Sequence, residues 1–272
     1  MILAYDFFQH ALIGGLLASI LCAMIGTYVV TRRLVIVGGG MAHASLGGVG
    51  LGAFFGINPL AGATVFALLV GWGVDFLTRR QVREDSAIAV LWTFGMAVGV
   101  LFAYLTPSFQ RDLTGYLFGD ILAITTGNLW FMAVLTVVTT AYFILLRNAI
   151  QTIAYDRSFA VTQGLPVRWL EYGLTILTAL TIVCCLRMVG IIMVVSLLSL
   201  PQQTAALLTR SFGGMIWVSA IIGFLGIVGG LMVSYWLSVP CGATIVIILV
   251  VFYIISRIFT TLTLFVSRRT DR

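Results

Sequence analysis

The stretch GGMIWVSAIIGFLGIVGGLMVSYW, residues 213–236, contains no charged residue. Its length exceeds the roughly 20 apolar residues that an α-helix needs to cross a bilayer. The whole chain of 272 residues resembles this stretch, because it is 61% hydrophobic and only 9% charged, with a mean hydropathy of +1.12. Soluble domains carry about a quarter charged residues, so the composition excludes one and predicts a polytopic membrane protein.

Further apolar runs bounded by charge, Pro or Asn lie on both sides of this stretch. With it, the candidates are 11–30, 41–56, 60–77, 87–105, 128–146, 172–186, 189–208, 213–236 and 242–264. The run 41–56 is the least secure, because it is rich in glycine and could form a broken helix. We therefore expect an all-α polytopic bundle of eight or nine transmembrane helices. No composition break marks a second domain, so residues 1–272 are predicted to form one membrane domain.

The basic residues predict the orientation of the bundle. All fifteen are arginines, and twelve of them fall in alternate connections or in the C-terminal tail. An excess of Arg marks the cytoplasmic side of a membrane protein, which places the N-terminus outside and the C-terminus inside. The net charge of +6 is thus explained by topology, and we expect no nucleic-acid partner.

Two sets of glycines recur at intervals of four residues. Gly48, Gly52 and Gly56 form the first set, and Gly226 with Gly230 forms the second. Residues four apart share one helix face, where glycine lets a neighbouring backbone approach closely. The pattern predicts close helix packing, with channel lining as the alternative.

His43 is the only histidine within a predicted span. An imidazole at membrane depth is costly unless it faces protein, water or a ligand. It could be satisfied by a neighbouring backbone carbonyl or serine, or it could be a transient ligand for a metal ion. A second ligand is not fixed by spacing; the candidates are Asp75, Asp120, Cys184, Met188 and Gln202.

A polar segment, Pro201-Gln202-Gln203-Thr204, falls inside the run 189–208. Proline should interrupt the helix and place two amides within the bilayer, which is tolerated only inside protein or beside a cavity. The segment is therefore either a gate or pathway element, with Pro201, Gln202 and Gln203, or a packing kink. Arg187, between two runs, is either an interfacial side chain or part of the mouth of a pathway.

The connection 148–171 is long enough for a short helix on the cytoplasmic side. A helix beginning near Asp156 should end at Gly164 and Pro166. This surface helix could contact a partner protein or lie on lipid headgroups. Phosphate loops, serine-hydrolase elbows and HExxH helices do not occur in the sequence, so no enzyme activity is predicted for this chain.

Several blocks of sequence, in order along nearly the whole chain, resemble the membrane permease subunit of bacterial and archaeal ABC importers for zinc, manganese or iron. The blocks are GTYVVTRRL (26–34), GGGMAHASLGG (38–48), REDSAIAV (83–90), LTGYLFGDIL (113–122), YDRSFA (155–160) with GLP (164–166), VGIIMVVSLLSLP (189–201) and SVPCG (238–242). The second block is similar to the family pattern G-D-A-x-x-H-A. His43 matches its histidine, while Gly39 stands at the position of its aspartate.

The resemblance implies a type II ABC importer-like fold and a set of partners. These are an identical or related second permease, two ATPase subunits below, and an extracytoplasmic metal-binding protein above. The resemblance also makes Asp156 to Gly164, with Ala160, the coupling helix that docks on an ATPase. Transport would proceed by alternating access, and the divalent metal ion would be cargo, with no permanently bound cofactor. The alternatives are a permease for metal chelates and an autonomous secondary metal carrier.

Overall fold

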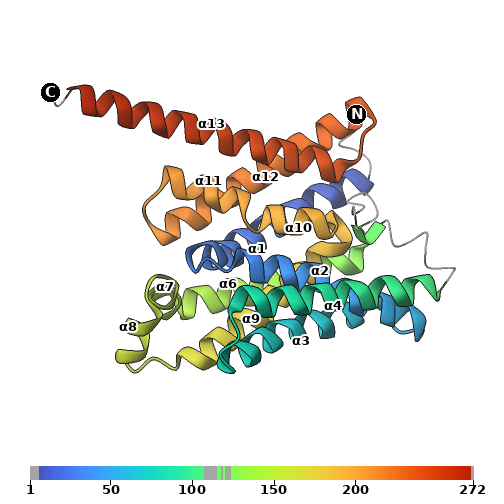
Figure 1. Cartoon of the computed structure of the whole chain (residues 1–272). Helices are drawn as coiled ribbons and strands as arrows, with labels where there is room; N and C mark the ends of the chain where they lie inside the picture. The colour runs from blue at the N-terminus through green and yellow to red at the C-terminus, as the bar shows by residue number, and fades with distance from the viewer. Residues whose placement is uncertain (1–5, 107–114, 118, 120–123, 271–272) are drawn as a thin grey trace.

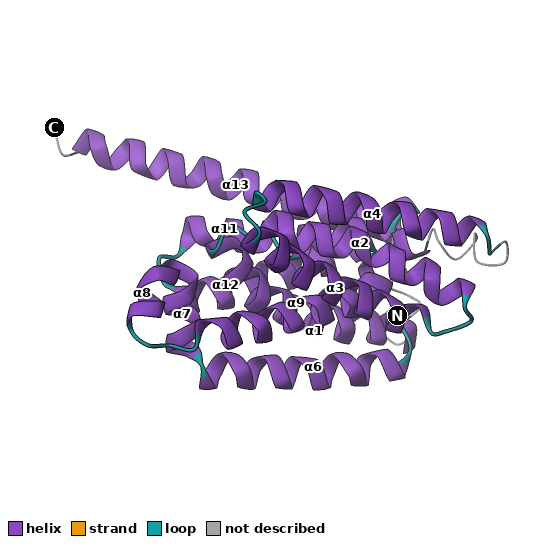
Figure 2. Cartoon of the chain, turned by 60° about the horizontal axis from the view of Figure 1, so that its bottom comes forward, coloured by secondary structure: helices purple, strands orange, loops and turns teal. Residues whose placement is uncertain are grey.

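The computed structural model describes residues 6–106, 115–117, 119 and 124–270. Within these ranges the chain forms helices joined by loops, without a strand, and this confirms the predicted all-α class (Figure 2). The helices are α1 (Asp6–Thr31), α2 (Val35–Phe54), α3 (Pro59–Arg79), α4 (Glu84–Tyr104), α6 (Thr126–Leu145), α7 (Arg147–Tyr155), α8 (Arg157–Thr162), α9 (Val167–Val189), α10 (Ile191–Leu197), α11 (Leu200–Leu208), α12 (Phe212–Leu237) and α13 (Cys241–Thr270).

Eight helices among the described residues are long and apolar enough to cross a membrane, which agrees with the lower of the two predicted numbers. They are α1, α2, α3, α4, α6, α9, α12 and α13. The remaining apolar run, 189–208, does not form one long helix. Its first residue ends α9, and the rest is divided between the short helices α10 and α11.

The short pair α10 and α11 explains where the two ends of the bundle lie. Figure 1 shows α1 beginning at one end and α13 finishing at the opposite end, where α7 and α8 also lie. Eight crossings alone would return the chain to the end at which it started. The additional passage is made by α10 and α11 together, so the chain traverses the bundle an odd number of times.

Helix α2 lies at the centre of the bundle, in contact with α3, α4, α9 and α10. The prediction that its glycine-rich run could be broken is wrong, because the helix is continuous from Val35 to Phe54. Its glycines meet neighbouring helices. A Cβ on Gly50 would lie 2.5 Å from the carbonyl oxygen of Gly99 in α4. Contact with the surrounding helices therefore offsets the low helix propensity of glycine.

Large apolar side chains also cover much of the outside of the bundle. On α13, for example, Ile247, Ile255 and Phe259 are each more than half exposed. In water such a surface would aggregate, but in a bilayer it meets lipid. Helix α12 packs against α13 through its glycines, since a Cβ on Gly226 would strike the side chain of Leu249.

Candidate functional site

The short helix α8 is built by local sequence signals. Asp156 is its N-cap, and Oδ1 of Asp156 accepts a hydrogen bond from the backbone N–H of Phe159 at 3.0 Å. At the other end Gly164 adopts a φ of +73°, a conformation that favours glycine. The N–H of Leu165 then donates to the carbonyl of Ala160 at 3.2 Å and closes the helix. The helix that the sequence predicts between Asp156 and Gly164 is present.

The two faces of α8 differ in exposure. Ala160 is fully buried and packs into the core of the chain. Its side chain is therefore not part of an external surface, although Ala160 was expected among the residues that couple to an ATPase. Phe159 and Val161 are instead 52% and 54% exposed. A partner that approached α8 would meet these two apolar side chains, which sequence reasoning did not single out.

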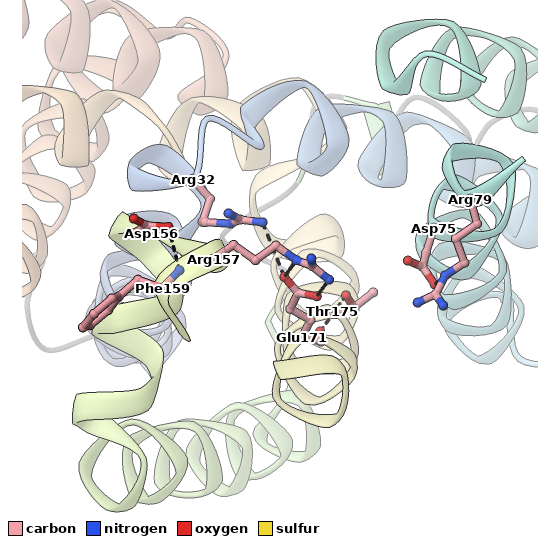
Figure 3. Close-up of polar contacts among 8 residues, drawn as sticks. All are labelled: Arg32, Asp75, Arg79, Asp156, Arg157, Phe159, Glu171 and Thr175. Carbon is pink, nitrogen blue, oxygen red and sulfur yellow. Dashed lines mark hydrogen bonds and ion pairs between the residues drawn. The ribbon is translucent and has the colours of Figure 1, made fainter. Parts of the chain in front are cut away.

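An ion-pair network joins α8 to the transmembrane helices. The Arg157 guanidinium donates from Nε to Glu171 Oε1 at 2.8 Å and from Nη2 to Oε2 at 3.1 Å. Arg32, which follows α1, reaches the same carboxylate at 3.4 Å. Figure 3 shows both guanidinium groups converging on Glu171. Hydrogen bonding to Glu171 raises the pKa of Arg157 above its ordinary value, so the guanidinium stays charged.

A cavity of about 910 Å³ opens beside this network, at the end of the bundle that carries α7 and α8. Its walls include the aromatic rings of Trp72, Trp169 and Tyr172. The charged residues that line it are Arg32, Arg79, Arg157, Arg168, Asp75, Glu84 and Glu171.

Asp75, which the sequence offered as a second metal ligand, is instead paired with Arg79 at 2.9 Å. The sequence analysis did not identify Glu171 as a candidate site residue. The available signal was its position as an isolated acidic residue at the start of the apolar run 172–186.

His43 lies on α2 and is half-buried. Its ring stacks on Trp92 of α4, with centroids 4.6 Å apart and an interplanar angle of 16°. The indole N–H of Trp92 donates a hydrogen bond to Met96 Sδ at 2.9 Å, and this bond holds the Trp92 ring in place. The imidazole therefore has one face covered by protein and retains some exposed surface.

Gly39 lies one helical turn before His43, where α2 meets α10. A Cβ at this position would be 3.7 Å from Val195 of α10, an ordinary van der Waals distance. Among the described residues, no three His, Cys, Asp or Glu side chains gather closely enough to hold a metal ion. Asp120 lies outside those residues. His43 thus has no acidic companion at the Gly39 position.

The interruption expected at Pro201 is present between α10 and α11. Pro201 cannot donate to the carbonyl of Leu197, four residues earlier. Gln202 supplies the missing donor, because its Nε2 donates to Leu197 O at 3.1 Å and to Cys22 O on α1 at 2.6 Å. Gly26 makes room for this amide, since a Cβ there would lie 2.7 Å from Gln202 Cδ. Gln202 is fully buried by these contacts.

The other predicted site residues lie at different places in the bundle. Gln203 is partly buried beside Gln202, and Arg187 lies in the last turn of α9. Gly48 packs against α3, where a Cβ would collide with the carbonyl of Gly62, and Gly52 similarly faces Pro59. Gly56 does not share this packing role, because it follows the end of α2 and no atom lies within 4 Å of its Cβ position.

Comparison with known proteins assigns this arrangement to a family. The model of the ABC 3 transport family matches residues 4–260. The manganese transport system membrane protein of Listeria monocytogenes is 29% identical over 95% of this chain and 92% of its own length. A probable iron transport system membrane protein of Haemophilus influenzae is 32% identical over 93% of this chain and 94% of its own length.

A solved structure shares the fold. PsaBC from Streptococcus pneumoniae, in complex with a Fab, contains a chain with a TM-score of 0.85 and 28% sequence identity, over 93% of this chain and 91% of the other. The family model covers nearly all of the residues that form the bundle described above. This chain therefore belongs to the ABC 3 transport family.

Proposed function

We propose that this chain is the membrane permease of an ATP-driven uptake system for a divalent metal ion, with zinc, manganese and iron as the candidate ions. The observation that carries the proposal is the family match over residues 4–260. Relatives named for manganese and for iron transport support the class of cargo. The permease provides the membrane passage, and ATP hydrolysis belongs to separate subunits. The metal is a transported substrate, and we expect no permanently bound cofactor.

The complete transporter is proposed to contain two permease copies, identical or related, with two ATPase subunits and an extracytoplasmic metal-binding protein. The exposed Phe159 and Val161 on α8 support docking of an ATPase at that end of the bundle. The arginines that line the cavity at this end support a cytoplasmic location for it. Since α1 begins at the opposite end, the N-terminus is then outside and the C-terminus inside.

Transport is proposed to follow alternating access between two permease copies. ATP binding closes the ATPase pair and moves the two α8 helices, and the passage changes the side to which it opens. A divalent ion is very unstable in hydrocarbon without ligands or water. His43 is proposed as a transient ligand, since its ring is held by Trp92 and retains exposed surface. Ligands along such a path must stay few, so that the ion can leave.

Uptake by the reconstituted complex in liposomes tests the proposal. Zinc, manganese and iron are supplied one at a time on the metal-binding protein, with and without ATP inside the vesicles. We expect ATP-dependent uptake of at least one ion. Uptake without ATP would indicate a secondary carrier, and uptake of a metal chelate in preference to free ions would indicate a chelate permease.

His43→Phe tests the ligand role within the same assay. Phenylalanine can still stack on Trp92 but cannot bind a metal ion. We expect uptake to fall by about tenfold or more, as for other metal-site changes, while the ATPase subunits remain bound. Trp92→Phe is the control, because it keeps an aromatic partner and the imidazole, and it should retain most of the uptake. Normal uptake by His43→Phe would remove the ligand role.

A further inference from the structure

The carboxylate of Glu171 is the point at which three parts of the chain meet. Arg157 is the first residue of α8, Arg32 follows α1, and Glu171 lies in the second turn of α9. Glu171 is 139 residues from Arg32 and 14 residues from Arg157 along the sequence. The contact therefore ties a short surface helix to two membrane-spanning helices that are far apart in the chain.

The geometry of this contact favours a defined orientation. Arg157 engages both oxygens of Glu171, and such a two-point pair fixes direction as well as distance. The Asp156 cap fixes the start of α8 immediately before Arg157, so the guanidinium and the helix move together. The side chain of Glu171 is 23% exposed and that of Arg157 is 49% exposed, which leaves the pair only partly screened by water.

Helix α9 extends from this contact toward the middle of the permease. It contains 23 residues and is about 35 Å long at 1.5 Å per residue. It ends at Gly190, which adopts a φ of +80° and turns the chain directly into α10. Val195 of α10 then faces Gly39 on α2, one turn from His43. A displacement of the first turns of α9 can therefore reach the region of His43 through α9 itself and the turn at Gly190.

A second ion pair in the same cavity lies within one helix, although Asp75 Oδ2 also accepts a hydrogen bond from the Tyr172 hydroxyl of α9 at 3.4 Å. Asp75 and Arg79 are 2.9 Å apart, but both belong to α3. Figure 3 shows them on a separate helix, away from the convergence of Arg32 and Arg157 on Glu171. The two pairs have similar chemistry and line the same cavity, yet of these two ion pairs only the one made by Glu171 joins charged side chains of different elements.

We propose that Glu171 is a positioning residue for transport: its ion pair with Arg157, supported by Arg32, transmits the displacement of α8 to α9 and α1. The inference rests on the proposed function, in which an ATPase subunit docks on α8. Without the ion pair, α8 can still receive the ATPase, but its movement is transferred less completely to the membrane helices. ATP hydrolysis then continues with less metal moved per ATP.

The test measures ATP hydrolysis and metal uptake in the same proteoliposomes, using the complete complex. The variants are Glu171→Gln, Arg157→Gln and the two together. We expect each single variant to lower the ratio of metal moved to ATP hydrolysed by about fivefold, while ATP hydrolysis stays within twofold of the unaltered complex. The double variant should be no worse than Glu171→Gln alone, because Arg157 acts through the carboxylate that this change already removes. Arg157→Lys keeps the charge and should recover at least half of the ratio.

The matched controls are Asp75→Asn and Arg79→Gln, which break an ion pair of the same cavity within one helix. Asp75→Asn keeps an oxygen that can accept the hydrogen bond from Tyr172 of α9. Both should leave the ratio unchanged. Equal losses in the controls, or additive losses in the double variant, would overturn the proposal. Selective loss of ATPase binding in Glu171→Gln would also overturn it, because the residue would then serve docking. Arg157→Gln keeps the test open if Glu171→Gln fails to fold, since Arg157 is half-exposed. Uptake by the unaltered complex tests the proposed function separately.

Discussion

Replacing Gln202 by methionine removes the amide that closes the break between α10 and α11. Methionine has a similar length and volume, so the change isolates the hydrogen bonds from the packing. Leu197 O loses its donor at 3.1 Å, and Pro201 has no N–H to replace it. Cys22 O loses the bond at 2.6 Å from Gln202 but keeps its own helical donor within α1.

The expected cost follows from these two carbonyl groups, less the relief from removing Gln202 Oε1, a buried acceptor without a hydrogen-bond partner among the described residues. An orphaned buried acceptor costs about 1–3 kcal/mol, while loss of a second bond to an acceptor that remains satisfied costs less. Hydrogen bonds between membrane helices average about 0.6 kcal/mol in comparable tests. We therefore expect Gln202→Met to lower the free energy of unfolding by about 1–3 kcal/mol.

The measurement is reversible unfolding of the permease in mixed detergent micelles, followed by circular dichroism. The diagnostic comparison is the same substitution in a Pro201→Ala background. Alanine restores an N–H that can donate to Leu197 O, so the cost of Gln202→Met should fall below about 1 kcal/mol there. Gln203→Met is the control, because its side chain makes no described hydrogen bond, and its effect should stay within about 0.5 kcal/mol. An equal cost of Gln202→Met in both backgrounds would refute the reasoning.

Two further substitutions test the packing of α2 and the start of α8. Gly48→Ala places a Cβ against the carbonyl of Gly62 and should lower the free energy of unfolding by about 1–3 kcal/mol in the same assay, because two helix backbones must separate. Asp156→Ala removes the cap of α8 at a cost of about 1 kcal/mol, so the amide of Phe159 should exchange with deuterium about fivefold faster.

Each of these substitutions has a control within the chain. Gly38→Ala lies on the same helix as Gly48, but its Cβ would meet only Val29 at 4.0 Å, so it should be neutral or slightly stabilising. A loss of stability equal to that of Gly48→Ala would show that helix propensity or membrane insertion causes the effect, rather than contact with α3. Asp156→Asn keeps a capping oxygen and should preserve slow exchange. Fast exchange in this variant would mean that the charge of Asp156, and not its hydrogen bond, orders α8.

Much of this protein is determined by local features of its sequence. Uncharged runs of about 20 residues must form helices in a bilayer, because each backbone group needs a partner inside its own segment. The class and the approximate number of spans therefore follow from composition alone. Asp156 and Gly164 likewise specify α8, since the cap and the left-handed residue act within a few positions of the helix they delimit.

The position of the broken helix was decided by tertiary contacts. Glycine content favoured a break in 41–56, but α2 is continuous because neighbouring backbones press against its glycines. The break lies instead before Pro201, where the amide of Gln202 bonds a carbonyl 180 residues away on α1. No local pattern could show that the amide of Gln202 bonds to α1.

The same distinction applies to the residues that connect α8 to the bundle. The sequence shows an arginine after α1, an arginine in α8 and an acid in α9, each of which could be a solvated charge. Only the packing of α1 beside α9 brings Arg32 and Arg157 to the same carboxylate of Glu171. Hydrophobic length fixes which segments cross the membrane, but side-chain contacts between distant segments depend on how the crossing helices rotate and pack against one another.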